Sequence, residues 1–201
     1  MVMDYEHHIF ISYAHGETWT HWVRNIFVPR LHDYLQLEMG RLEIFVDDQI
    51  QTGARWDDVL RRKIACSKIM LCLISADYFQ REWCRREMAL ILERERQVGL
   101  EGKNENYGLI IPIRLGDGQC FPDLIGRIQY QDFGDYADPD LPRGTERASQ
   151  FNQNIKQLAK TIVQTLPKAP DFCDDWLSLT GEDFLKELEP LMTVTLPRLF
   201  V

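Results

Sequence analysis

The sequence predicts an α/β domain with a doubly wound parallel sheet that carries helices on both faces. Apolar runs of strand length recur along the chain and alternate with segments that have helical spacing. Strands that alternate with helices pair in parallel through right-handed crossovers. The strongest run, KIMLCLIS at residues 68–75, is apolar throughout, as expected of a strand that is covered on both faces.

The first part of the chain predicts two more strands, each followed by a helix. HIFISY (8–13) is a nearly continuous apolar run rich in β-forming residues. Apolar residues then keep helical spacing from Trp19 to Leu35, and Pro29 within this pattern should kink the helix or split it in two. LEIFVD (42–47) predicts the second strand, which is followed by the turn-like DDQIQTGARW and a short helix, DDVLRRKIACSK.

After the strand at 68–75, a helix is expected to run through REMALILERERQ, followed by a polar loop. LIIPIRL (109–115) predicts the fourth strand, in which Pro112 would mark an edge or a bulge. RIQYQDF (127–133) is a weak fifth strand, and a last helix is expected over roughly 147–166.

Residues 167–201 are expected to form a linker and a short helical tail outside the domain. PKAPDF reads as the linker, and the acidic segment after it has enough leucine and phenylalanine for one or two small helices. These helices would either dock on the domain or connect it to a partner, and the sequence does not choose between the two.

The composition excludes several classes of function. A net charge of -8 and a pI near 5.1 argue against a general attraction to nucleic acid or anionic membranes. Five cysteines without a CxxC pair, and five histidines without metal-ligand spacing, predict a reducing cytoplasmic setting and no metal site. The chain has no signal-peptide pattern and no apolar run of about 18 residues, so we expect it to be neither secreted nor membrane-spanning.

Glu87 occupies an unusual position in the helix that follows the third strand. Its neighbours three and four residues away are Trp83, Cys84, Leu90 and Ile91, and none of them is basic. A solvated helical glutamate usually has a basic neighbour or faces open water. We therefore expect this carboxylate at the rim of a pocket, while an ordinary surface glutamate remains the plain alternative.

Three separated motifs carry a resemblance to a known family: IFISYAH at the first strand, FVDDQIQTGARW after the second, and ISADYFQREWCRRE across the third strand and the next helix. In this order and on these elements they resemble the Toll/interleukin receptor (TIR) domain, and specifically its bacterial, NAD-cleaving members. The resemblance covers about residues 8–166, so we take residues 1–166 as a TIR domain. It implies a flavodoxin-like, five-stranded sheet in the order 2-1-3-4-5.

The resemblance also implies a site and a reaction. In open α/β sheets the ligand lies at the carboxyl ends of the strands, where the strand order reverses. NAD-cleaving TIR proteins use a glutamate four residues after a bulky residue, and WCRRE matches this at Trp83 and Glu87. Glu87 would be the catalytic residue, and the expected substrate-binding residues are Ser12, Tyr13, Ala14, His15, Asp47, Gly53, Trp56 and Trp83. NAD+ would be a substrate and no cofactor is expected.

The chemistry that the resemblance implies needs only one carboxylate. Nicotinamide leaves NAD+ as a neutral molecule, so no general acid has to protonate it, and a fixed anion stabilises the oxocarbenium-like ribose. Water would then give ADP-ribose, and a base nitrogen of the same molecule would give a cyclic product. The resemblance implies a role in immune defence and self-assembly with other TIR domains. Whether the tail leads into a sensor domain or another partner stays open at the level of the sequence.

Several residues depart from the family pattern or have another explanation, and other functions compete with NAD cleavage. Some NAD-cleaving members have arginines where this chain has Ala14 and His15, which argues against arginine contacts with phosphate or ribose there. No GxGxxG motif follows any strand, which argues against a redox dinucleotide site of the Rossmann kind. For Trp56 and Trp83, packing against the rest of the domain is the alternative to contact with a substrate. For Asp47, the alternative is a structural role in capping a turn or a helix. A non-enzymatic scaffold that binds other TIR domains stays open as the second function. A phosphoacceptor receiver domain is disfavoured, because the first and third strands end in Ser12–Tyr13 and Ser75.

Overall fold

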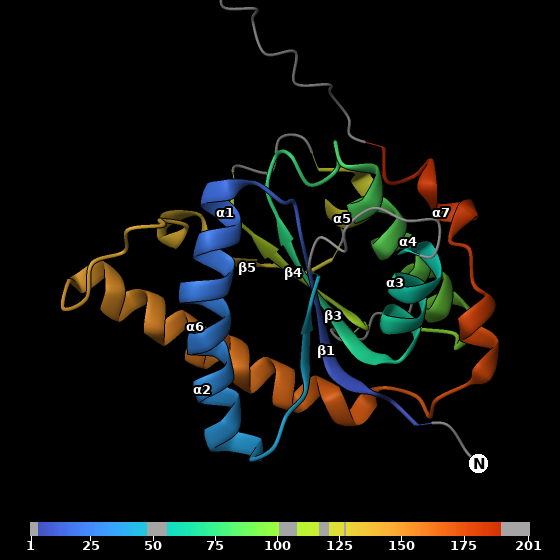
Figure 1. Ribbon diagram of the computed structural model, residues 1–201, viewed down its shortest axis with the longest axis horizontal. Coiled ribbons are helices and arrows are strands. Elements are labelled where there is room, and N and C mark those ends of the chain that lie inside the picture. The colour runs from blue at the N-terminus through green and yellow to red at the C-terminus, as the bar shows by residue number, and fades with distance from the viewer. Residues whose placement is uncertain (1–3, 48–55, 101–107, 117–120, 127, 190–201) are drawn as a thin grey trace, which may run out of the picture.

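A five-stranded parallel sheet in the order β2-β1-β3-β4-β5 forms the centre of the protein (Figure 1). This computed structural model describes residues 4–47, 56–100, 108–116, 121–126 and 128–189. The strands are β1 (His7–Tyr13), β2 (Ile44–Val46), β3 (Ser67–Ile74), β4 (Ile110–Arg114) and β5 (Gln131–Asp132). The predicted fold and strand order are confirmed, although β5 is only a two-residue edge strand.

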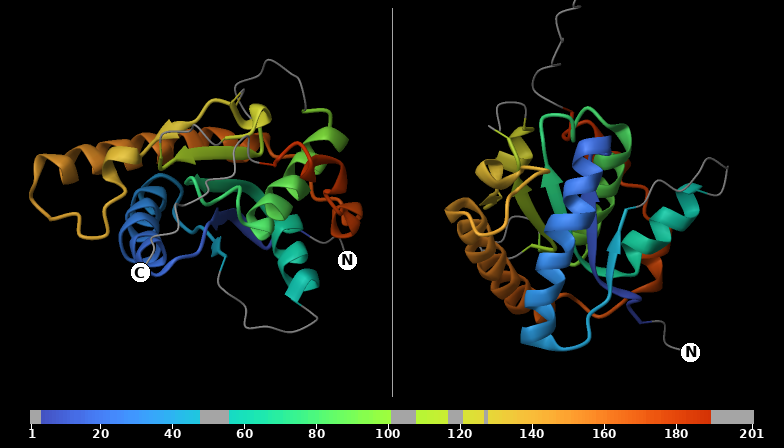
Figure 2. Two further views of the ribbon diagram at one scale, coloured as in Figure 1. Left: turned by 90° about the horizontal axis from the view of Figure 1, so that it is seen from above. Right: turned by 60° about the vertical axis from the view of Figure 1, so that its left-hand side comes forward.

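Helices cover both faces of the sheet (Figures 1 and 2). On one side α2 packs against α6, and on the other α3 packs against α4. The α-helices are α1 (Glu17–Trp22), α2 (Val28–Met39), α3 (Trp56–Ala65), α4 (Glu82–Gln97), α5 (Asp123–Gly126), α6 (Glu146–Thr165) and α7 (Glu182–Leu185). Short turns of other helix types are η1 (Val23–Phe27), η2 (Gly134–Tyr136), η3 (Leu166–Lys168) and η4 (Asp174–Ser178). The sequence did not predict the short helix α5.

Pro29 has the predicted effect on the first helical segment. It lies in the first turn of α2, and a π-helical turn, η1, separates α2 from α1. A proline ring clashes with the carbonyl four residues earlier, and the wider π turn relieves this clash. The backbone stays helical on both sides, with φ of -57° at Val23 and -61° at Val28.

Pro112 lies in an internal strand, so the expectation of an edge strand is wrong. Cys72 of β3 is its register partner, and β5 borders β4 on the other side. Leu109 and Leu115 direct their backbone polar groups toward β3, so Pro112, at odd spacing from them, directs its nitrogen toward β5. The pairing with β5 begins only at Ile113, and the proline therefore removes no hydrogen bond from the described ladder.

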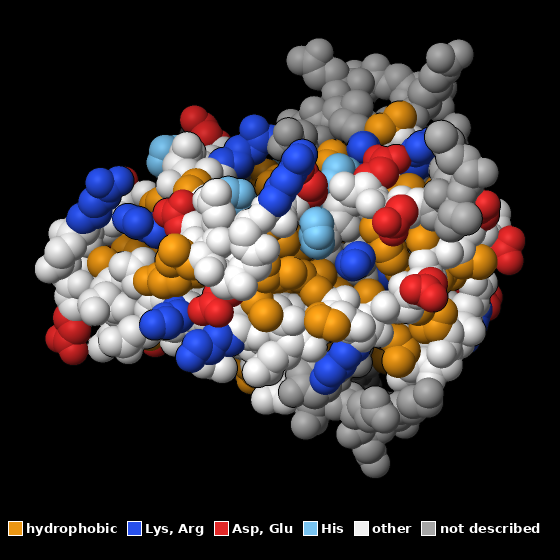
Figure 3. All heavy atoms as spheres, turned by 90° about the horizontal axis from the view of Figure 1, so that it is seen from below, with side chains coloured by type: hydrophobic (Ala, Val, Ile, Leu, Met, Phe, Trp, Pro, Cys, Tyr) orange, Lys and Arg blue, Asp and Glu red, His pale blue; other side chains and the backbone are white. Residues whose placement is uncertain are grey.

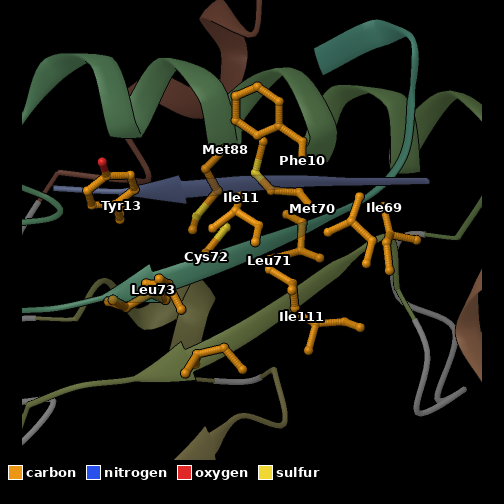
Figure 4. Packing of buried hydrophobic residues seen from close by; sticks show 14 of the residues in the cluster. Phe10, Ile11, Tyr13, Ile69, Met70, Leu71, Cys72, Leu73, Met88 and Ile111 are labelled. Carbon is orange, nitrogen blue, oxygen red and sulfur yellow. The ribbon is translucent and has the colours of Figure 1, made fainter. Parts of the chain in front are cut away.

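The core surrounds β1 and β3, because both faces of these strands are covered. Ile9, Phe10 and Ile11 are fully buried, which explains why HIFISY is apolar without alternation. Figure 4 shows Phe10 and Met88 lying between β1 and α4. This packing fixes the rotation of α4 about its axis, because Met88 must face the sheet. The direction in which the preceding residue, Glu87, projects is thereby fixed as well.

The tail from Ala169 to Glu189 docks on the domain instead of projecting from it. Tyr5 donates a hydrogen bond to the carbonyl of Pro170, and Trp176 lies over the guanidinium of Arg94 at 4.7 Å. Further along, the backbone N–H of Gly181 donates to a carboxylate oxygen of Glu93 in α4 at 2.6 Å. Of the two arrangements that the sequence left open, the structure has the docked one.

The surface that the structure describes carries both signs of charge. On the face in Figure 3, Lys and Arg side chains lie interspersed with Asp and Glu side chains. Within the described ranges, none of the helices has the length and apolar character that a membrane crossing requires.

Candidate active site

Glu87 is the centre of a buried polar cluster below the carboxyl end of β1. It lies in the second turn of α4 and is only 1% exposed. Its helical neighbours Cys84 and Ile91 are buried as well, so this face of α4 points at the sheet. The expectation that Glu87 lies at the rim of a pocket is therefore wrong for this structure. The buried neighbours of Glu87 at three-and-four spacing place its carboxyl group in the interior, because they put this face of α4 against the sheet.

A directed chain of hydroxyl groups leads to the Glu87 carboxyl group. Ser12, next to last in β1, donates a hydrogen bond to Oε2 of Glu87 at 2.5 Å. The hydroxyl of Tyr78 lies 2.7 Å from the same serine oxygen. Because Ser12 has only one hydrogen and gives it to Glu87, Tyr78 must be the donor in the second bond. Both residues are fully buried.

Asp47 brings a second carboxyl group to the cluster. It follows β2, and its backbone N–H donates to the carbonyl of Ile11 at 3.0 Å, which fixes it beside the end of β1. Its side chain is buried and lies within hydrogen-bonding reach of the Glu87 carboxyl group. On its other side, Oδ2 lies 2.9 Å from Nε2 of His15, close but without hydrogen-bond geometry.

These surroundings favour the uncharged form of Glu87. Burial is the largest cause, and the nearby negative charge of Asp47 is the second; together they raise the pKa of the Glu87 carboxyl group well above its ordinary value of 4.5. The hydrogen bond from Ser12 acts in the opposite direction, because it stabilises the carboxylate. Such a pair of neighbouring acidic groups with a strongly displaced pKa is typical of functional sites.

The cysteines around the cluster are poor nucleophile candidates. Burial raises the pKa of the Cys84 thiol and of the Cys72 thiol, and the charge of Glu87 adds to the effect in both. The thiolate is the reactive form of cysteine, and burial suppresses it here. Packing is the role that the structure supports for these two side chains.

The residues expected at the end of β1 are brought together at the site. Ser12 contacts Glu87, and His15 contacts Asp47. Tyr13 stacks on the His15 ring with 4.5 Å between the ring centres, and Ala14 between them is buried. Figure 4 shows Tyr13 at the end of β1. Its hydroxyl oxygen is buried without a hydrogen-bond partner among the described residues.

The other expected residues do not join this cluster. Trp83 is 44% exposed, and its ring lies 5.8 Å from the guanidinium carbon of Arg86, away from the buried face of α4. Trp56 is the first residue of α3, and its side chain falls outside what the structure describes. Gly53 also lies outside the described residues. Contacts of these three residues with a substrate stay predictions.

Sequence reasoning missed two features of the cluster. Tyr78 was not among the expected site residues, although it follows β3 at the carboxyl end of the sheet. Asp47 was expected to bind substrate, not to lie against Glu87. No spacing signal links Asp47 to Glu87, because their contact depends on the pairing of β1 with β2 and on the packing of α4.

A groove elsewhere on the molecule contains none of these groups. It lies between the α2 side and the start of α6, and Asn25, Arg30 and Asn152 are among its lining residues. Nothing in that lining brings two titratable groups together in a buried setting. The chemistry-bearing cluster of the described residues is the one around Glu87.

Comparison with known proteins gives a family and several relatives. The family model described as "TIR domain" matches residues 9–148. The disease resistance protein RPS4 of Arabidopsis thaliana is 31% identical over 164 residues, which is 81% of this chain. The disease resistance-like protein DSC1 of the same plant is 31% identical over 108 residues, 54% of this chain. The chain spans only 12% and 8% of the lengths of these two relatives.

Two solved structures show a more distant similarity. One is the TIR domain of the Toll-related receptor TRR-2 from Hydra magnipapillata, with a TM-score of 0.42, 21% identity, and coverage of 74% of this chain and 98% of the other. The second, with a TM-score of 0.40 and 17% identity, is the TIR domains of the activated Roq1 resistosome, which directly recognises the pathogen effector XopQ. It covers 77% of this chain and 84% of the other.

Proposed function

The chain belongs to the TIR domain family, and from that premise we propose that it is an enzyme that cleaves the bond between nicotinamide and ribose in NAD+. The observation that carries the proposal is the position of Glu87. Its carboxyl group is held by Ser12 at the carboxyl end of β1, beside Asp47. The carboxyl ends of the strands at a switch in strand order are where open α/β sheets bind ligands, and β1 and β3 border that switch here.

Glu87 as a carboxylate would stabilise the positive charge that develops on the ribose as the bond to nicotinamide breaks. A fixed anion in a site that excludes water does this with little reorganisation, because the surrounding groups are already oriented. Ser12 and Tyr78 hold the carboxyl group in place through their hydrogen-bond chain. Water at the anomeric carbon would then give ADP-ribose, and an adenine nitrogen would give a cyclic product.

The burial of Glu87 sets a condition on this activity. A side chain that is 1% exposed cannot contact a dinucleotide until neighbouring parts of the chain move. We propose that assembly with other copies of the domain supplies this opening, as part of a defence response in the cytoplasm. In a reducing cytoplasm the cysteines at 66, 72, 84 and 173 would stay free thiols, as the structure has them.

The burial also favours a second candidate function. A TIR domain whose glutamate never opens to solvent would act as a scaffold that binds other TIR domains without cleaving NAD+. Glu87 would then be a structural group that ties α4 to β1 through Ser12.

The deciding experiment measures nicotinamide release from NAD+ at high protein concentration, with and without a crowding agent. Wild type is compared with Glu87→Ala, Glu87→Gln and the matched control Glu82→Gln, an exposed glutamate of the same helix that pairs with Arg86. Release that is lost in both Glu87 variants and kept in the control supports the enzyme. Retained turnover in the Glu87 variants rejects it. No release from any of the proteins, together with no rise of the melting temperature by NAD+, favours the scaffold.

A further inference from the structure

Two buried carboxyl groups, those of Glu87 and Asp47, belong to the cluster, and each has one oxygen without a partner among the described residues. Oε1 of Glu87 and Oδ1 of Asp47 are both buried and accept no hydrogen bond from the described residues. The Asp47 side chain lies within hydrogen-bonding reach of Glu87. Two ionised carboxylates cannot bond to each other, because neither has a hydrogen to donate. One proton on either group would turn this contact into a hydrogen bond and satisfy both oxygens.

The hydroxyl groups nearby cannot take that role. Ser12 gives its only hydrogen to Oε2 of Glu87, and Tyr78 gives its own to Ser12. No Lys or Arg among the described residues forms an ion pair with Glu87. A buried, unpaired second negative charge is strongly unfavourable, and a buried group of this kind binds a proton instead.

We propose that Asp47 and Glu87 form a pair that shares one proton, and that Asp47 is the positioning residue that sets the charge of Glu87. In the resting protein the proton bridges Oε1 of Glu87 and Oδ1 of Asp47, and the pair carries one negative charge. The chain then runs from Tyr78 through Ser12 and Glu87 to Asp47, with His15 against the outer oxygen of Asp47.

A role for the pair in catalysis rests on the proposed function. The nicotinamide ring of NAD+ is a cation, and its arrival beside Glu87 would favour the charged form of that residue. The O–H bond at Glu87 breaks and an O–H bond forms at Asp47, so the proton stays within the pair and the total charge is unchanged. Glu87 becomes a carboxylate without releasing a proton to water. Asp47 acts through Glu87 and needs no contact with the substrate.

The groups that face Glu87 come from each element that packs around it. They are Asp47 after β2, Cys72 in β3, Tyr78 after β3 and Cys84 in α4. His15, after β1, lies against Asp47. Burial raises the pKa of the phenol and of both thiols, so these three stay uncharged near neutral pH.

The first test needs no catalytic activity. We would measure the melting temperature of wild type, Glu87→Gln, Asp47→Asn and the double variant over about pH 5 to 8.5. A group with a raised folded pKa stabilises the protein at low pH, and that stability is lost as the pH rises above the unfolded value of 4.5. Glu87→Gln should therefore raise the melting temperature relative to wild type, and the gain should grow with pH.

Comparing the effect of Glu87→Gln in wild type and in Asp47→Asn tests whether the two carboxyl groups act as a pair. In the Asp47→Asn background the gain from Glu87→Gln should be several-fold smaller at neutral pH, because the second carboxylate is gone. An equal gain in both backgrounds at every pH would overturn the proposal. Glu82→Gln, on the exposed side of the same helix, is the control and should give no gain that grows with pH.

Two further measurements keep the test decisive if a variant does not fold. The infrared spectrum of wild type at neutral pH should contain the carbonyl band of a protonated carboxylic acid, and its absence would overturn the proposal. In nicotinamide release, Asp47→Asn should move the acid limb of the pH profile of kcat/KM to lower pH, and an unmoved limb would overturn it. A protonated pair in a protein that never releases nicotinamide would support the pair and reject the proposed function.

Discussion

Ser12 Oγ, near the carboxyl end of β1, lies 2.5 Å from Oε2 of Glu87 and is the one described donor to that carboxyl group. The bond joins β1 to α4 inside the core, where both residues are closed to solvent. A serine hydrogen bond to a buried carboxyl group does two things: it fixes the side chain, and it lowers the free energy of the charged form.

Ser12→Ala should therefore affect both stability and the pH profile. Loss of the bond should cost about 1 to 3 kcal/mol in the free energy of unfolding, because Oε2 is left without a partner. The pKa of Glu87 should rise further, so the acid limb of nicotinamide release should move to higher pH, opposite to the effect of Asp47→Asn. Urea unfolding and initial rates over pH measure the two effects.

Ser67→Ala is the matched control for this change. Ser67 is equally buried, at the start of β3, and donates to the carbonyl of Lys63 at 2.7 Å, far from the cluster. It should lose a similar amount of stability with no shift of the pH profile. A shift in the control as large as that in Ser12→Ala would show that the profile reports general weakening of the fold.

Cys84 should resist alkylation although it lies three residues from Glu87 in the chain. Its thiol is buried, and burial raises its pKa, so almost no thiolate is present at neutral pH. Iodoacetamide at neutral pH should label the partly exposed Cys173 much faster, as read by mass spectrometry of peptides. Fast labelling of Cys84 in the folded protein would contradict this account of the site.

Arg94 should be among the most sensitive positions of the fold. Its guanidinium is fully buried, donates to the carbonyls of Ser67 and Lys68, and lies under the ring of Trp176. Arg94→Leu removes the hydrogen bonds to both carbonyls and the contact with Trp176, and it should cost about 3 to 5 kcal/mol of unfolding free energy. Arg96→Leu, which breaks an exposed ion pair with Asp183, should cost less than about 1 kcal/mol. Equal losses in urea unfolding would contradict the difference in burial.

Gly181 and Gly144 form a matched pair that separates backbone strain from crowding. Both have positive φ, of 71° and 81°. A Cβ at Gly181 would lie 2.8 Å from the Cβ of Ala89 in α4, whereas one at Gly144 has no heavy atom within 4 Å. Gly144→Ala should cost about 1 to 2 kcal/mol. Gly181→Ala should cost clearly more and loosen the tail, which faster proteolysis within residues 169–189 would report.

Activity that needs assembly should rise faster than linearly with protein concentration. The reason is the burial of Glu87 in the single chain, which leaves its carboxyl group closed to a dinucleotide. The rate of nicotinamide release per mole of protein should increase over a wide range of concentration and level off once assembly is complete. A strictly constant rate per mole would show that one chain opens the site alone.

The central strands could be predicted from the sequence because their apolar runs report burial on both faces. The edge strand β5 could not be delimited in the same way. RIQYQDF is a mixed run of seven residues, whereas among its described residues only Gln131 and Asp132 pair with β4. Pro29 was interpreted correctly, since its steric effect is local. Pro112 was not, since its effect depends on which neighbouring strand its nitrogen faces.

The candidate site was predicted in part for a similar reason. Glu87 could be found from its own helical neighbours and from the motif around it. The contact with Asp47 arises from strand pairing and helix packing between segments far apart in the chain, and no local pattern reports it. The docking of the tail could not be predicted for the same reason. The fit of Gly181 against α4 depends on two backbone segments that meet only in the folded protein.

That fit ties the evolution of two distant segments together. Ala89 and Gly181 leave no room for a larger side chain on either of them, and the N–H of Gly181 also uses the carboxylate of Glu93. Homologues that keep the docked tail should therefore keep small residues at positions 89 and 181 and a hydrogen-bond acceptor at position 93. Lineages that have lost the tail are released from all three constraints at once, so variation at these positions should appear and disappear as a set.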